Sequence, residues 1–292
     1  RGVRIVYTHP DYLVETDWLS EHLDAPDLRL FDVTAMLTSK FLNLAKERSF
    51  DEGHIPGARF LDVGSRDNSL SETGADLPWA WPDAKSAAKA LGKLGIDNQS
   101  RVVLYAASPR PGVDNGIMWT TRAWWIMRAF GVDCAILNGG FERWRSEGLR
   151  VVTDSPDAHP NATFELTADA SDKVALKANV MAALSASDSC IVDALPPASY
   201  DGTGQISYGD RKGHITGAIN IPYATVTDEN GRFLDAERLR EVLRNAGALD
   251  SPAVITYCGG GIAATTIAFC LALLGHSQVS VYDGSLFEWT AD

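Results

Sequence analysis

The chain repeats itself, and this internal duplication limits its possible folds more than any other feature of the sequence. The segment "EGHIPGARFLDV" at 52–63 returns as "KGHITGAINIPY" at 212–223. The neighbouring parts keep their order: "LRLFDV" and "SCIVDA" come before, and "SRVVLYAAS" and "PAVITYCGG" come after, followed by "AILNGGFERW" and "VSVYDGSLFEW". The sequence therefore predicts two copies of one fold.

Each copy alternates short Val, Ile and Leu-rich runs with amphipathic stretches such as "DAKSAAKALGKLG" and "AERLREVLRNAG". This pattern is typical of an α/β domain in which helices flank a mainly parallel sheet. A chain of 292 residues with 45% hydrophobic residues is long enough for two such cores. We expect an N-terminal domain over 1–150, a linker over 151–170 and a C-terminal domain over 171–292.

The repeated "GHI(P/T)GA" motif predicts a tight turn into the strand that follows it. Gly57 and Gly217 would allow the backbone conformation of this turn. We expect backbone groups of the turn to hold His54 and His214, which makes a catalytic role for either histidine the less common outcome.

The charge balance restricts the partners. The chain has 26 basic and 38 acidic residues, with a net charge of -12 and a pI of about 4.9. The electrostatic field of such an acidic protein does not attract nucleic acid or an anionic membrane. No stretch approaches the roughly 18 to 20 apolar residues of a membrane span. The N-terminal segment also shows no signal-peptide core, and we expect a cytoplasmic location.

Four cysteines are present, at Cys134, Cys190, Cys258 and Cys270. They form no C-x-x-C pair and no cluster at metal-ligand spacing, so neither a disulfide framework nor a zinc site is predicted. We expect three of them, Cys134, Cys190 and Cys270, to be small core residues. Cys258 differs because it ends an apolar run and precedes a glycine-rich loop.

This loop, "YCGGGIAA", fits the dinucleotide-binding pattern G-x-G-x-x-A through Gly259, Gly261 and Ala264. Asp283 lies about where a ribose-binding acid would be expected. The first copy, however, reads "YAASPRPGVDNG" in the corresponding place, so the fold does not require these glycines. The loop is better interpreted as a cradle for the sulfur of Cys258.

What distinguishes the second copy is a cysteine where the first copy has Ala106. A loop curled around this sulfur would aim its N–H groups and the start of the next helix at one point, which favours an anion there. We therefore expect the loop to stabilise a thiolate and to lower the pKa of Cys258. The small residues Gly259, Gly260, Gly261 and Ala263 would let the backbone approach closely.

The order of these motifs resembles the two-domain sulfurtransferases, rhodanese and 3-mercaptopyruvate sulfurtransferase, over nearly the whole chain. The resemblance implies two tandem rhodanese-like domains, of which the second is catalytic and the first lacks the cysteine. It also implies that Cys258 takes a sulfur atom from a small-molecule donor, holds it as a persulfide and passes it to cyanide, a thiol or a thioredoxin-like acceptor. No metal or organic cofactor is implied.

The sequence departs from this family in two places. Related enzymes commonly read "DSR", with a donor-binding arginine, where this chain has Leu195 in "DAL". A serine often follows Cys-Gly in the mercaptopyruvate enzymes, and Gly260 stands there. The resemblance implies that Arg211 in "YGDRKGHITGA" is a second donor-binding arginine, and a solvated surface charge is the alternative. Arg110 of the first domain could supply another positive charge. The loop residues expected to contact the donor are Gly259, Gly260, Gly261, Ile262 and Ala263.

A loop without cations favours 3-mercaptopyruvate, which has one carboxylate, over the thiosulfate dianion. Thiosulfate sulfurtransferase activity by the same mechanism is the alternative. A phosphatase, the first rival from another class, would need an arginine six positions after the cysteine, where this chain has Ala264. The second rival is a non-catalytic sulfur carrier or scaffold, and a turnover that Cys258→Ala abolishes would exclude it.

Overall fold

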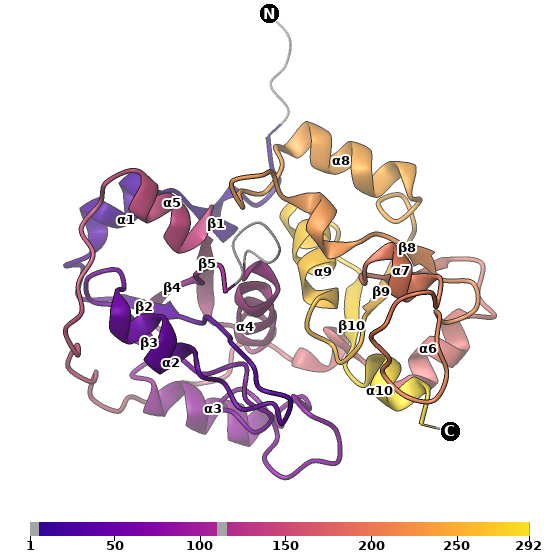
Figure 1. Cartoon of the computed structure of the whole chain (residues 1–292), viewed down its shortest axis with the longest axis horizontal. Helices are drawn as coiled ribbons and strands as arrows, with labels where there is room; N and C mark the ends of the chain where they lie inside the picture. The colour runs from indigo at the N-terminus through magenta and orange to yellow at the C-terminus, as the bar shows by residue number, and fades with distance from the viewer. Residues whose placement is uncertain (1–5, 110–115, 292) are drawn as a thin grey trace, which may run out of the picture. The chain divides into compact units, whose positions relative to one another are not determined.

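A computed structural model describes residues 6–109 and 116–291 and divides the chain into two compact units (Figure 1). One unit comprises Asp11–Ala170 with Glu229–Arg232, and the other comprises the N-terminal segment to Pro10 with Ser171–Asp228 and Phe233–Asp292. Arg110 lies outside the described residues.

The first unit is built on a five-stranded sheet in the order β1-β5-β4-β2-β3, in which every pair is parallel. Tyr105, at the end of the central strand β4, is fully buried, as are most side chains of this strand, because both faces of a parallel sheet are covered. The strands are β1 (Leu13–Val14), β2 (Leu28–Asp32), β3 (Arg59–Phe60), β4 (Arg101–Tyr105) and β5 (Asp133–Leu137).

The second unit repeats this plan in the order β6-β10-β9-β7-β8, again with parallel pairs throughout. Its strands are β6 (Val174–Ala175), β7 (Ser189–Asp193), β8 (Ile219–Asn220), β9 (Ala253–Tyr257) and β10 (Val279–Tyr282). The position of each strand matches its counterpart in the first unit. The two α/β domains predicted from the duplication are therefore confirmed.

Helices flank each sheet (Figure 1). The first unit contains α1 (Thr16–His22), α2 (Ala45–Arg48), α3 (Ala84–Lys93), α4 (Ile117–Ala129) and α5 (Gly140–Ser146). The second contains α6 (Lys177–Ala183), α7 (Pro197–Tyr200), α8 (Ala236–Asn245), α9 (Ala264–Leu273) and α10 (Ser285–Trp289). Short 3-10 helices lie at Pro10–Tyr12, Phe50–Glu52, Ala170–Asp172 and Tyr223–Val226.

Two kinds of helix follow from the sequence. The amphipathic helices α3 and α8 begin at aspartates, and the carboxylates of Asp83 and Asp235 accept the first free backbone N–H groups. Helices α4 and α9 are instead apolar on nearly all sides and almost wholly buried. The buried pair are the helices that follow the central strands of the two units.

The N-terminal segment groups with the second copy, whereas the predicted division places it with the first. The backbone N–H groups of Thr8 and His9 both donate to the Leu273 carbonyl, at 3.1 Å each, and the Thr8 hydroxyl donates to Leu274. These donors satisfy carbonyl groups at the end of α9. The limits 1–150 and 171–292 remain a prediction of where each repeated fold begins and ends.

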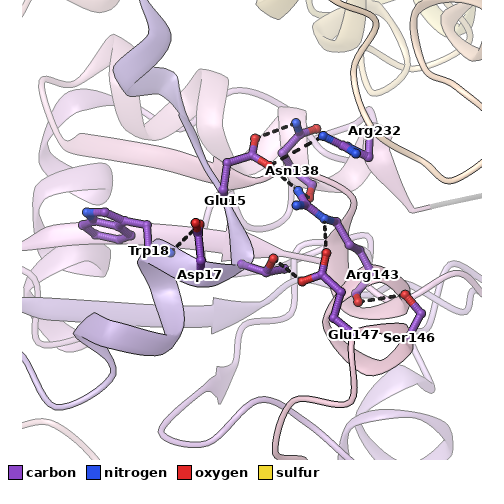
Figure 2. A network of polar contacts seen from close by, with 9 residues as sticks. Glu15, Asp17, Trp18, Asn138, Arg143, Ser146, Glu147 and Arg232 are labelled. Atoms are coloured by element: carbon purple, nitrogen blue, oxygen red, sulfur yellow. Dashed lines mark hydrogen bonds and ion pairs between the residues drawn. The ribbon is translucent and has the colours of Figure 1, made fainter.

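A polar network ties β1 and α1 to α5 in the first unit (Figure 2). Arg143 donates to Glu15 and, at 2.8 Å, to Glu147, while Thr16 donates to the other oxygen of Glu147. Arg232 lies 3.8 Å from the carboxylate of Glu15. The Arg143 side chain is mostly buried, but the carboxylates of Glu15 and Glu147 are exposed, so solvent screens each ion pair and its contribution to stability is small.

The repeated turns form as the sequence predicts. Gly57 and Gly217 have φ angles of 77° and 87°, in the left-handed region. Nδ1 of His54 lies 2.9 Å from the Phe50 carbonyl. Nδ1 of His214 likewise lies 2.8 Å from the Tyr200 carbonyl, and each ring stacks on the aromatic residue that it bonds. Both histidines are therefore held by backbone carbonyls, as expected, but these belong to the preceding 3-10 helix and to the end of α7 and not to the turns themselves.

Candidate active site

Cys258 lies between the carboxyl end of β9 and the start of α9, with 2% of its surface exposed. The N–H groups of Gly260, Gly261 and Ala264 donate hydrogen bonds to its sulfur. Gly261 reaches this geometry with a φ angle of 76°, which a residue with a side chain rarely adopts. The predicted cradle of backbone donors around a sulfur is thus present.

The predicted effect of this cradle on the pKa is wrong. Burial raises the pKa of the Cys258 thiol above its ordinary value, and the charge of Asp193 raises it further. The three N–H groups oppose the rise without overcoming it. The sequence shows that the donors are there, but it does not show how completely the fold removes water from the sulfur, and here desolvation is the larger effect.

Helix α10 holds Cys258 from the other side. Leu286 and Phe287 donate backbone hydrogen bonds to the carbonyls of Cys258 and Gly259, at 3.1 and 2.9 Å. The N–H of Cys258 donates to the hydroxyl of Ser285 at 3.2 Å, and this hydroxyl donates to the Tyr282 carbonyl at 2.7 Å. The cysteine is therefore fixed at both its backbone polar groups.

Ser285 was not singled out from the sequence, although a comparison of the copies contained the signal. Its φ angle is 46°, where the first copy has Gly140 at 58°. In both copies the backbone N–H of the next residue donates to the carbonyl of the residue that follows the central strand. Phe141 donates to Ala106 in the first copy, and Leu286 donates to Cys258 in the second. Only the copy that contains Cys258 has a serine, and not a glycine, at this position of the left-handed region. A strained non-glycine residue is expected at a functional site.

Gly259 leaves no space for a side chain because the ring of Tyr208 lies against it. A Cβ atom built on Gly259 would lie 2.0 Å from Cε1, 2.4 Å from Cδ1 and 2.6 Å from Cζ of this ring. Tyr208 was also missed at the level of sequence. It belongs to a loop without regular secondary structure, and no periodic pattern announces where such a side chain points.

Leu195 stands in the position of the absent arginine and is 5% exposed, so it is a core residue. Its backbone N–H donates to the carboxylate of Asp193 at 2.8 Å. The first copy places Thr34 there, and this hydroxyl links the Asp32 carboxylate to the N–H of Ala107. The second copy therefore has an apolar side chain where the first has a polar bridge.

Arg211 is exposed, and its Nη2 donates to the Trp289 carbonyl at 2.5 Å, at the end of α10. It is thus bonded to the same short helix whose first turn holds Cys258. The neighbouring Lys212 donates to the Gly204 carbonyl at 3.0 Å. The five predicted loop residues are all buried around the sulfur site: Gly259, Gly260, Gly261, Ile262 and Ala263.

The remaining cysteines lie in strands or a helix of the two cores. Cys134 in β5 and Cys270 in α9 are completely buried, and Cys190 in β7 is half-buried. Burial raises the pKa of all three thiols. The assignment as core residues is confirmed for Cys134 and Cys270, whereas Cys190 lies in β7 only half-buried.

Across 6–109 and 116–291, no group of three or more His, Cys, Asp or Glu side chains could hold a metal ion. In the same part of the chain, no helix is long and apolar enough to cross a membrane.

Comparison with known proteins matches the rhodanese-like domain model to residues 15–147 and 176–292. The chain is 31% identical over 287 residues to a 3-mercaptopyruvate sulfurtransferase of Escherichia coli K12, covering 96% of this chain and 95% of that protein. It is 32% identical over 284 residues to a thiosulfate sulfurtransferase of Gallus gallus, covering 95% and 92%. The crystal structure of the E. coli 3-mercaptopyruvate sulfotransferase SseA superposes with a TM-score of 0.78 at 28% identity, covering 94% and 98%.

Proposed function

The chain belongs to the rhodanese-like family and is a sulfurtransferase, and on this premise we propose that it moves the sulfur of 3-mercaptopyruvate to a thiol or cyanide through a persulfide on Cys258. One observation carries the proposal. A cysteine ringed by three backbone N–H donors lies at a strand-to-helix junction in the second copy, at the position that Ala106 occupies in the first. The first copy is accordingly proposed to be catalytically silent.

The proposed reaction has two nucleophilic steps. In the first, the Cys258 thiolate attacks the sulfur of 3-mercaptopyruvate, a sulfur–sulfur bond forms and the carbon–sulfur bond breaks. The electron pair stays on carbon as the pyruvate enolate, which takes a proton from water. In the second, an acceptor thiolate or cyanide attacks the outer sulfur, and Cys258 leaves as a thiolate. The cycle therefore needs no external oxidant or reductant.

The backbone around Cys258 fits both steps. N–H donors that point to the sulfur would also stabilise the thiolate that leaves in the second step. Because burial raises the pKa of the resting thiol, the attacking thiolate has to form within a dry site, where the same donors have their strongest effect. A buried thiolate is in turn a reactive nucleophile, since water does not solvate it.

The choice of donor rests on charge. The loop over 259–263 consists of Gly, Ile and Ala and offers only backbone dipoles. We propose that these residues and Arg211 bind the donor, with Arg211 holding the single carboxylate of 3-mercaptopyruvate. Leu195 supplies no charge, which disfavours the thiosulfate dianion. Thiosulfate sulfurtransferase activity remains the alternative, and the identities to relatives of both names, 31% and 32%, are nearly equal.

The physiological acceptor, whether a small thiol, cyanide or a thioredoxin-like protein, stays a prediction, as does the cytoplasmic location.

Steady-state kinetics with both donors at matched acceptor concentration tests the proposed function. We expect kcat/KM to favour 3-mercaptopyruvate by at least about tenfold, since one ionic hydrogen bond is worth roughly 1.5 to 3 kcal/mol. Cys258→Ala should remove turnover of both donors, with Cys190→Ala as the matched control that keeps it. A preference for thiosulfate would overturn the donor assignment, and turnover by Cys258→Ala would overturn the mechanism.

A further inference from the structure

The copy that contains the cysteine has a loop that the other copy lacks. In the first copy, His54 bonds to and stacks on Phe50, four residues before it. In the second copy, His214 makes the same contacts with Tyr200, fourteen residues before it. The connection is therefore ten residues longer in the second copy. The extra length falls between two anchored ends, and we call residues 201–210 the inserted loop.

The inserted loop places an aromatic ring beside the reactive cysteine. Tyr208 lies so close to Gly259, the residue after Cys258, that Cζ would be 2.6 Å from an added Cβ atom. The phenol oxygen is bonded to Cζ, so the hydroxyl also lies next to this loop. Burial, followed by the charge of Cys258, raises the pKa of Tyr208 well above its ordinary value. The hydroxyl thus keeps its proton and remains a hydrogen-bond donor.

The ring is held in place by α10. Tyr208 packs edge to face on Phe287, with 5.5 Å between ring centroids. The Tyr208 carbonyl accepts a hydrogen bond from Thr290 at 3.1 Å. Since Phe287 also donates to the carbonyl of Gly259, one short helix fixes both the ring and the cysteine loop. Tyr208 is therefore positioned by packing and backbone contacts, and these contacts do not use its hydroxyl.

We propose that Tyr208 is a catalytic residue whose hydroxyl donates a hydrogen bond to the outer sulfur of the Cys258 persulfide. This inference rests on the proposed function, because it assigns the hydroxyl a role on the sulfur in transit. Among the described residues, the hydrogen bonds of Tyr208 run through its backbone, and its hydroxyl does not donate to the resting Cys258 sulfur. A second sulfur atom extends the side chain by about 2 Å, one sulfur–sulfur bond length.

The hydrogen bond would favour the anionic form of the outer sulfur. Persulfides of Cys258 can be formed with inorganic polysulfide, in which the thiolate attacks a terminal sulfur and the shortened polysulfide leaves with the electron pair. The acid dissociation constant of the outer thiol is then read from the near-ultraviolet absorbance of the persulfide anion against pH. In Tyr208→Phe we expect this constant to fall about tenfold to a hundredfold, the effect of a lost hydrogen bond to a charged group.

Tyr200→Phe is the matched control, because Tyr200 lies at the other end of the inserted loop and donates to the Ala218 carbonyl at 2.6 Å. It should lower Tm while leaving the dissociation constant unchanged. An unchanged constant in Tyr208→Phe, or an equal shift in Tyr200→Phe, would overturn the proposal. Polysulfide loads the cysteine without 3-mercaptopyruvate, so failure of the proposed donor chemistry is seen separately from failure of this titration.

Discussion

Gly259→Ala should destabilise the second unit because the new methyl group overlaps the ring of Tyr208. The added carbon would lie 2.0 Å from Cε1, whereas carbon atoms in contact are normally about 3.5 to 4.0 Å apart. Either the ring leaves its site or the loop moves away from it. Overpacking of this kind costs about 1 to 3 kcal/mol, which lowers Tm by roughly 3 to 9 °C for a unit of this size.

The assay is a double-mutant cycle in which urea unfolding and single-turnover sulfur transfer are measured for every variant. In a Tyr208→Ala background the obstructing ring is gone, so Gly259→Ala should cost less than about 0.5 kcal/mol. Gly247→Ala is the control, since its φ angle is 87° and an added Cβ meets nothing within 4 Å. Its cost, about 1 to 2 kcal/mol, comes from the backbone alone and should be equal in both backgrounds.

The rate of sulfur transfer also distinguishes the two glycine substitutions. Gly259→Ala shifts the loop that carries the donors to Cys258, so we expect a loss of at least about tenfold. Gly247→Ala should transfer sulfur at the wild-type rate, because this residue follows α8 and lies outside the site. If Gly259→Ala costs the same with and without the Tyr208 ring, the reasoning about this contact is refuted.

Two further predictions concern a buried acid and the donor cation. Burial raises the pKa of Asp32 to about 6 from 3.8, so its contribution to stability is complete below about pH 4 and lost as the pH rises through 6. Asp32→Asn should remove about 3 kcal/mol of this pH dependence in urea unfolding, and an unchanged pH profile would exclude a buried neutral acid. Arg211→Ala should raise KM for 3-mercaptopyruvate about tenfold to a hundredfold, with Arg211→Lys between the two. Equal KM values for all three proteins would show that Arg211 does not hold the carboxylate.

The duplication made the fold predictable. Because each apolar run recurs in the same order, the two sheets have the same strand order, and the comparison of Ala106 with Cys258 shows which copy has a cysteine at the strand-to-helix junction. These conclusions depend on local patterns that a sheet and its helices impose on the chain. They do not require knowledge of which side chains meet in space.

The rest depends on tertiary contacts. Desolvation decides the direction of the Cys258 pKa, and burial is a property of the whole fold. Tyr208 reaches Gly259 from a loop whose path no periodicity encodes. The association of residues 6–10 with the second copy depends on free carbonyls at the end of α9, which a sequence does not display. Ser285 could be predicted only in part, because the sequence shows its alignment with Gly140 but does not show its positive φ angle.

The central claim is that Cys258 alone carries the sulfur in transit. Intact mass after incubation with 3-mercaptopyruvate, in the absence of acceptor, should show a gain of one sulfur atom. Peptide mapping should place this atom on Cys258, because its sulfur alone among the four cysteines is cradled by backbone N–H donors at a helix start. The extra sulfur on Cys134, Cys190 or Cys270, with Cys258 unmodified, would contradict the mechanism.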